Sequence, residues 1–293
     1  MSYFVKFWGT RGSIPTPGNK TKRFGGNTSC VEIRAGDQLL ICDAGSGIRE
    51  LGADLMTRGL SSMVVHLFLT HAHWDHIQGF PFFTPVYIPG NNCFIYGLRE
   101  GDNRFYNLLS GQMSSDYFPV SFADLRANIG PRHLSDGHSE IGGVSITTHP
   151  LEHPGGCIGY SFRWEDRKVV YATDNEIDRV LVDPSVDRKP AGEIRAVREP
   201  LVNFVKDADL LISDGQYTDE DYRVKAGWGH PSCLTAVDLA VQAKVKNLAI
   251  FHHDPERSDA DVDRMIDLCR KRAADLKSDL VVFGAREGVE LKI

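Results

Sequence analysis

The chain has 293 residues, of which 42% are hydrophobic and 25% are charged, and its formal net charge is -6. These are ordinary values for a soluble globular protein, and the negative balance argues against a general nucleic-acid binder, which would carry a basic surface. The first residues do not form a secretory signal, no apolar run has membrane-spanning length, and the six cysteines contain no CxxC pair. We therefore expect a cytoplasmic protein with reduced, mostly buried thiols and no membrane partner.

Short apolar runs separated by Gly-rich turns predict strands over 5–9, 30–35, 38–43 and 64–70. Residues 47–58 predict a helix, because Ile48, Leu51 and Leu55 fall on one face. The stretch 85–140 is rich in aromatic residues, Gly and Asn and has no clear period. Because it is short and has few aliphatic residues, we expect an insertion or lid there and not a separate domain.

Strands and helices alternate in the last part of the chain. Strands are predicted over 144–148, 158–164, 168–173, 210–213, 248–251, 280–283 and 289–292, and helices over 231–244 and 259–277. The charged, Pro-containing stretch 183–200 is expected to be a surface loop that leads into a helix. Pro231 suits the first turn of its helix, and Ser258 or Asp259 suits the cap of the next. This order favours two β-sheets with helices outside, in a single domain over 1–293.

Histidines cluster directly after the strand predicted over 64–70. Residues 71–76 read His71-Ala72-His73-Trp74-Asp75-His76. Imidazole nitrogens are costly to bury unless they are satisfied, and histidine is the commonest metal ligand. His71 and His73 can point the same way on an extended chain, whereas Asp75 and His76 cannot join that arrangement without a turn. We expect two neighbouring metal sites that need further ligands, because zinc takes at least three from the protein.

Three later residues supply candidates for those ligands. His153, Asp174 and His252 each follow a predicted apolar strand, at positions where side chains of different strands can converge. His149 and His253 are the neighbouring alternatives.

The His71–His76 motif with these partners resembles the metallo-β-lactamase superfamily. More narrowly it resembles the phosphodiesterase branch, which includes the tRNA 3′-end endonuclease and cyclic-nucleotide phosphodiesterases. The resemblance runs from the Gly9-Thr10-Arg11-Gly12-Ser13-Ile14-Pro15 segment to the His252-His253-Asp254-Pro255 segment, and so covers nearly the whole chain. It implies a fold of the α+β or α/β class, the four-layer αβ/βα sandwich, with two metal ions at one edge.

The resemblance implies seven ligands for two divalent cations. One ion would be held by His71, His73 and His153, the other by Asp75, His76 and His252, and Asp174 would bridge both. The interval from His153 to Gly159-Tyr160 favours it over His149, and the strand-end position favours His252 over His253, which would then support a ligand. Zinc is the first choice of metal, with manganese or iron as alternatives.

The resemblance also implies catalytic groups beside the ligand Asp75. His230 precedes a predicted helix and would protonate the departing oxygen, and Asp214 at a strand end would orient it. Asp43 is expected to be a structural or supporting carboxylate. The segment 9–17 and the residues Asn27, Thr28 and Ser29 either present backbone N–H groups to a phosphate or form hairpin turns.

We therefore expect a dinuclear metal-dependent phosphodiesterase that hydrolyses a small phosphodiester, first a cyclic nucleotide or cyclic phosphate, by attack of a metal-bridging hydroxide. One alternative is a tRNA 3′-processing endoribonuclease. The acidic net charge, the lack of a basic Gly-rich arm and Trp74, where that family usually has glycine, argue against it. The other alternative is a non-catalytic sensor or scaffold, which would need none of these ligands. A homodimer is also expected from the relatives.

Overall fold

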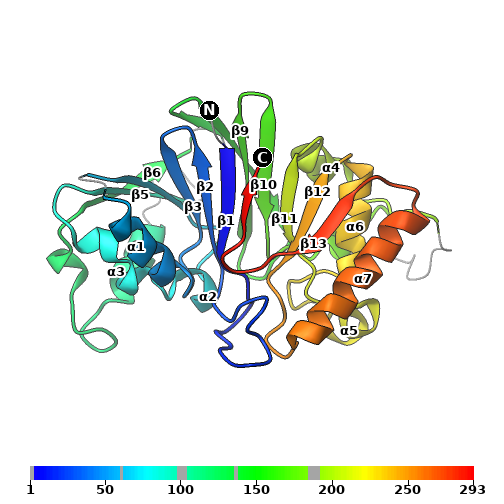
Figure 1. Cartoon of the computed structure of the whole chain (residues 1–293), viewed down its shortest axis with the longest axis horizontal. Coiled ribbons are helices and arrows are strands. Elements are labelled where there is room, and N and C mark those ends of the chain that lie inside the picture. The colour runs from blue at the N-terminus through cyan, green and yellow to red at the C-terminus, as the bar shows by residue number, and fades with distance from the viewer. Residues whose placement is uncertain (1–2, 60–61, 98–103, 135–137, 184–191) are drawn as a thin grey trace. The chain divides into compact units, whose positions relative to one another are not determined.

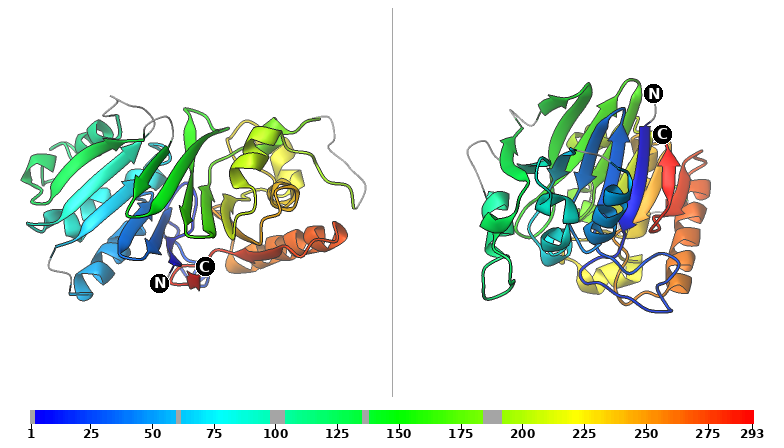
Figure 2. Two further views of the ribbon diagram at one scale, coloured as in Figure 1. Left: turned by 90° about the horizontal axis from the view of Figure 1, so that it is seen from above. Right: turned by 60° about the vertical axis from the view of Figure 1, so that its left-hand side comes forward.

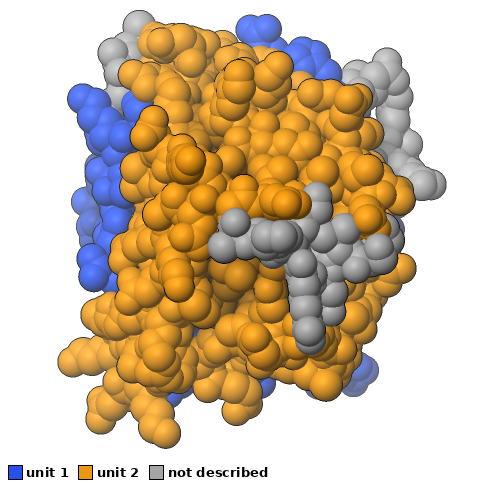
Figure 3. Space-filling view, turned by 90° about the vertical axis from the view of Figure 1, so that its right-hand side faces the viewer, with its two compact units in different colours: residues 1–17, 25–142, 286–293 blue, residues 18–24, 143–285 orange. Residues whose placement is uncertain are grey.

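The computed structural model describes residues 3–59, 62–97, 104–134, 138–183 and 192–293. Its strands form two seven-stranded sheets, of order β14-β1-β2-β3-β4-β5-β6 and β13-β12-β11-β10-β9-β8-β7 (Figure 1). The chain divides into two compact units, coloured in Figure 3. Unit 1 comprises residues 1–17, 25–142 and 286–293, and unit 2 comprises residues 18–24 and 143–285. Among the described residues no helix has both the length and the apolar character needed to span a bilayer.

The sheet of unit 1 is antiparallel at one end and parallel at the other. Its strands are β1 (Tyr3–Gly9), β2 (Cys30–Ala35), β3 (Gln38–Cys42), β4 (Val64–Phe68), β5 (Asn92–Gly97), β6 (Asn128–His133) and β14 (Glu290–Lys292). The pairs from β14 to β3 are antiparallel, and those from β3 to β6 are parallel. In β1 the buried and half-buried residues alternate, as expected of a strand with one face in the core.

The described residues of unit 1 form the helices α1 (Ile48–Thr57), α2 (Trp74–Ile77) and α3 (Arg104–Gly111). The predicted face of α1 is confirmed, because Ile48, Leu51 and Leu55 are buried in one apolar cluster with residues of β3 and β4. Short 3₁₀ turns lie at Phe80–Phe82, Thr84–Tyr87 and Phe122–Asp124.

The stretch 85–140, expected to be an insertion or lid, contains regular secondary structure. Strands β5 and β6 lie within it and extend the parallel part of the sheet, and α3 packs beside them. Because β5 and β6 are parallel, the chain between them must be a long crossover, and α3 lies in that connection. The short strand β7 (His138–Ile141) lies just before the unit boundary. Movement of the stretch as a lid stays a prediction.

The sheet of unit 2 starts with antiparallel hairpins and continues with parallel strands. Its strands are β8 (Val144–Leu151), β9 (Cys157–Trp164), β10 (Arg167–Ala172), β11 (Leu210–Asp214), β12 (Asn247–Phe251) and β13 (Val281–Gly284). Strands β8, β9 and β10 pair antiparallel, and β10 to β13 pair parallel. Every residue of β11 is buried, as expected of a parallel strand covered on both faces.

The helices of unit 2 are α4 (Glu199–Val205), α5 (Asp219–Lys225), α6 (Cys233–Gln242) and α7 (Asp259–Asp275), and Ile177–Val180 is a 3₁₀ turn. Helices α6 and α7 lie against each other and contact the parallel strands (Figures 1 and 2). Their apolar residues share one cluster with those of β10 to β13. This packing fixes the ends of the parallel strands, where the candidate site residues lie.

The helix boundaries test two capping predictions. The side chain of Ser258 accepts from the backbone N–H of Asp261 in a capping box, so Ser258 is the cap of α7, as predicted. Pro231 does not lie in the first turn of α6, because the side chain of Ser232 caps that helix one residue later. Residues 184–191 of the predicted loop 183–200 lie outside the described residues, and α4 begins at Glu199. All six cysteines are buried, as predicted.

Candidate metal centre

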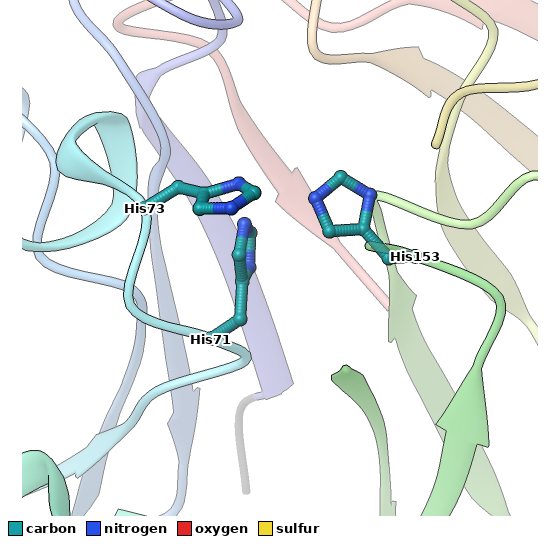
Figure 4. Close-up of side chains that lie close together, drawn as sticks. All are labelled: His71, His73 and His153. Atoms are coloured by element: carbon teal, nitrogen blue, oxygen red, sulfur yellow. The ribbon is translucent and has the colours of Figure 1, made fainter. Parts of the chain in front are cut away.

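The four ligand residues of the 71–76 motif lie together in unit 1. The chain leaves β4 at Phe68, and α2 starts with His73 as its N-terminal boundary residue, which provides the turn that the motif requires. The rings of His71 and His73 lie edge to face with their centroids 4.5 Å apart (Figure 4). The rings of His71 and His76 lie 4.2 Å apart, and Nε2 of His76 lies 3.4 Å from Oδ2 of Asp75.

A buried carboxylate orients these histidines. Oδ2 of Asp43, the residue after β3, lies 2.7 Å from Nδ1 of His76. The hydroxyl of Thr70 donates to the same carboxylate at 2.9 Å and lies 3.0 Å from Nδ1 of His71. Since the carboxylate can only accept, the protons lie on Nδ1 of both rings. Nε2 is then the nitrogen that each histidine would offer to a metal ion, as in the carboxylate–histidine pairs of known metal sites.

The segment 9–17 and residues Asn27 to Ser29 were expected either to bind phosphate or to form turns. Several of their backbone N–H groups donate hydrogen bonds to other residues of unit 1. The N–H of Ser13 donates to Oδ2 of Asp75 at 2.7 Å. The N–H of Asn27 donates to Glu287 at 2.6 Å, and that of Thr28 donates to the hydroxyl of Ser46 at 2.9 Å. Thr28 and Ser29 are fully buried. The N–H groups of Asn27 and Thr28 therefore already have acceptors inside the protein, and a phosphate cradle at Asn27, Thr28 and Ser29 stays a prediction.

In unit 2 the predicted bridging residue lies between two histidines. Asp174 follows β10, His153 follows β8 (Figure 4) and His252 follows β12. Oδ1 of Asp174 lies 3.9 Å from Nε2 of His153, and Oδ2 lies 3.5 Å from Nε2 of His252. Two ligands of one zinc ion, each bound at about 2 Å, lie roughly 3–4 Å apart. Asp174 could therefore hold a divalent ion together with either histidine.

The sheet explains why these residues meet. Strands β10, β11 and β12 are parallel neighbours in register, with Ala172 opposite Ser213 and Asp214 opposite Phe251. Their carboxyl ends therefore lie side by side, which is where open α/β sheets bind ligands. Asp174 and His252 adopt positive φ angles of 58° and 55°, the left-handed region, which Asp and His adopt more readily than most non-glycine residues.

His230 and Asp214 form the expected pair. Nδ1 of His230 lies 3.1 Å from Oδ2 of Asp214, which is fully buried at the end of β11. Burial, and then the neighbouring Asp174, raises the pKa of Asp214 well above its usual range. The His230 ring stacks on that of His252 with centroids 5.0 Å apart. Two groups, one of His153, Asp174 and His230 and one of Asp214, His230 and His252, have ligand atoms within 4.8 Å of one another.

The remaining histidines belong to neither ligand set. Nε2 of His253 lies 2.8 Å from the carbonyl oxygen of Ala285, so its ring is hydrogen-bonded to the backbone and His252 is the better ligand candidate. His149 stacks on Phe204, with centroids 5.1 Å apart. His66 is a core residue of β4, as expected, and its Nδ1 lies 2.9 Å from the hydroxyl of Tyr96.

One functional contact was missed from the sequence. Nδ1 of His153 donates to the carbonyl oxygen of Gly229 at 2.9 Å, which leaves Nε2 as its metal-binding nitrogen. The acceptor lies 76 residues further along the chain, so no local pattern could have indicated it. The donor chemistry as a whole, imidazoles and carboxylates, fits divalent metal ions.

Comparisons with known proteins agree with this chemistry. The family described as "Beta-lactamase superfamily domain" matches residues 39–253. The ribonuclease Z of Natronomonas pharaonis is 25% identical in an alignment that covers 86% of this chain and 87% of that protein. The metallo-beta-lactamase fold protein YhfI from Bacillus subtilis superposes with a TM-score of 0.66 over 100% of both chains at 18% identity. The short form of human tRNase Z gives a TM-score of 0.62 at 18% identity, over 98% of both chains.

These structural likenesses confirm the predicted fold class, two mixed sheets flanked by helices in the metallo-β-lactamase arrangement. The family match covers well over half of the chain, from β3 to the histidines after β12. It includes the motif at 71–76 and the three later ligand candidates. The chain therefore belongs to the β-lactamase superfamily, the family that its sequence resembles.

Proposed function

We propose that the seven predicted ligands hold two divalent metal ions and that the protein cleaves phosphodiester bonds in RNA, as a 3′-processing endoribonuclease. The observation that carries the metal-dependent part is the placement of Asp174, whose two carboxylate oxygens face His153 and His252 separately. Relatives named ribonuclease Z, 23–25% identical over 86–100% of this chain, support RNA as the substrate. They reverse the ranking from the sequence, which placed a small cyclic phosphodiester first.

The chain is a metal-dependent hydrolase, as expected from its family and its ligand residues. Zinc is the first choice of metal. The seven ligand candidates, four in the 71–76 motif and three later in the chain, are imidazoles and carboxylates, and zinc binds both readily. When bound, the ions supply a water that ionises near neutral pH and positive charge beside the phosphate.

His230, oriented by Asp214, would protonate the leaving group. With Nδ1–H directed to Asp214, the His230 imidazole presents Nε2 as the atom that holds and delivers a proton. Asp214 fixes the tautomer and the orientation of the ring. Stacking on His252 and the contact with Asp174 at 3.7 Å keep the His230 ring next to the predicted ligands. This assigns His230 the role of general acid, and Asp214 that of its orienting group.

A small phosphodiester is the second candidate substrate, and one observation favours it. The chain between His153 and Asp174 consists of the β9–β10 hairpin, whose strands are separated by Glu165 and Asp166 alone. No basic arm that would hold a tRNA body is inserted at this described part of the chain. A shorter substrate would not need such an arm.

A hydrolysis panel with the metal-loaded protein distinguishes the candidates. It compares precursor tRNA with a 3′ trailer, 2′,3′- and 3′,5′-cyclic nucleotides and bis(p-nitrophenyl) phosphate, with Asp174→Ala as a control for contaminating nucleases. We expect cleavage of the precursor at its 3′ side, loss of that cleavage on chelation, and slow turnover of cyclic nucleotides. Rapid turnover of cyclic nucleotides with intact precursor would favour the second candidate. Inertness toward every substrate would indicate the non-catalytic scaffold.

A further inference from the structure

Glu176, two residues after Asp174, has a buried carboxylate with three hydrogen-bond donors. Its side chain is 1% exposed. Oε1 accepts from the N–H of Gly227 at 2.7 Å and from the hydroxyl of Tyr222 at 2.8 Å, and Oε2 accepts from the N–H of Gly229 at 3.0 Å. A carboxylate is costly to bury, and here both of its oxygens accept hydrogen bonds that offset this cost. None of these partners was indicated by the sequence.

Two of the donors belong to the loop that carries His230. Gly227 and Gly229 have φ angles of 90° and 89°, which L side chains rarely adopt, and His230 follows directly. A Cβ atom at Gly229 would lie 2.3 Å from Nδ1 of His153. This close approach is what allows the carbonyl oxygen of Gly229 to accept from His153. The position of the loop therefore determines two functional histidines at once.

The backbone of Glu176 is hydrogen-bonded to the segment that carries His153. Its N–H donates to the carbonyl oxygen of Glu152 at 2.8 Å, and the side chain of Asn175 accepts from the N–H of Glu152 at 3.1 Å. The residues after Asp174 thus contact the segment before His153 through the backbone and the loop before His230 through the carboxylate. Glu176 joins three of the segments of unit 2 that carry predicted site residues, those of His153, Asp174 and His230.

We infer that Glu176 is a positioning residue: its carboxylate fixes the loop 227–230, so that His230 holds its proton at the correct place and His153 keeps its ligand nitrogen toward the metal. The inference rests on the proposed function for its catalytic consequence. A carboxylate is required because both loop contacts are N–H donors. Glutamine offers one acceptor oxygen, so Glu176→Gln leaves one loop N–H facing an amide NH₂ group.

The test compares Glu176→Gln with Tyr222→Phe in the full-length, metal-loaded protein. Tyr222→Phe is the matched control, because it removes one hydrogen bond to the same carboxylate and leaves both loop contacts. For Glu176→Gln we expect kcat to fall about 10–100-fold, as for other residues that orient metal-site groups, while KM stays within about 3-fold. Tyr222→Phe should stay within about 3-fold of the wild-type kcat.

Hydrogen exchange of the Gly227 and Gly229 amides provides a second readout that does not depend on activity. In the wild-type protein both amides should be protected, and in Glu176→Gln at least one should exchange about 10-fold faster or more. Unprotected amides in the wild-type protein, an unchanged kcat in Glu176→Gln, or an equal loss in Tyr222→Phe would overturn the inference. If the wild-type protein cleaves no phosphodiester, the proposed function fails, and the exchange result still decides whether Glu176 holds the loop.

Discussion

Oδ2 of Asp43 lies 2.7 Å from Nδ1 of His76, and both side chains are fully buried. Asp43 also accepts from the N–H and the hydroxyl of Thr70, at 2.9 Å each. It is therefore the group that fixes the orientation of a predicted ligand without being placed to bind the metal itself.

Replacement of Asp43 by asparagine should weaken metal binding about 10–100-fold, because the His76 ring loses the charge that fixes its tautomer. The measurement is a competition titration with a chromophoric chelator. Asp37→Asn, in the exposed turn between β2 and β3, is the control. Wild-type affinity in Asp43→Asn would show that His76 does not depend on this carboxylate.

Replacement of His230 by alanine should leave the metal content intact and lower turnover about 10²–10⁴-fold, the usual contribution of general acid catalysis. Metal content is measured by elemental analysis, and turnover with the best substrate of the panel. The exposed His138→Ala is the control and should behave like wild type. Because His230 lies among candidate ligand atoms, a parallel loss of metal would mean that it is a ligand and not the acid.

His66 should make the stability of the fold depend on pH. Burial, and then the charge of Arg132, lowers the pKa of His66 from 6.5 to about 4. The unfolded chain therefore binds more protons between these values than the folded chain, so the free energy of unfolding falls as pH decreases from about 6.5 to about 4. His66→Gln should reduce this slope, whatever its effect at neutral pH. Urea denaturation at several pH values tests it, and identical slopes in both proteins would contradict the assignment.

Much of the fold could be predicted because its local patterns are strong. The strand predicted over 30–35 matches β2, and the apolar spacing of Ile48, Leu51 and Leu55 located α1. The residues after β10 and β12 were found because a polar ligand type directly follows a buried strand. That reasoning predicted that their side chains can converge, and in the structure Oδ2 of Asp174 lies 3.5 Å from Nε2 of His252.

The rest depends on contacts that are distant in sequence. Strands β5 and β6 were missed. The apolar part of β5 is short, Cys93 to Tyr96, and pairing with β4 stabilises it, whereas Gly130 and Pro131 interrupt the apolar pattern of β6. The role of Glu176 was missed for the same reason, since its carboxylate meets Tyr222 and Gly227 some 50 residues later. Pro231 looked like a helix start, but the side chain of Ser232 decided where α6 begins.

The most direct test of the account is a metal titration of the apo protein that follows bound metal and phosphodiester hydrolysis together. The apo protein should be inactive, and activity should rise until two equivalents of zinc are bound per chain. In Asp174→Ala, which lacks the bridging carboxylate, that second equivalent should no longer bind tightly. Full hydrolysis without metal, or saturation of activity at one equivalent with Asp174→Ala unchanged, would contradict the account.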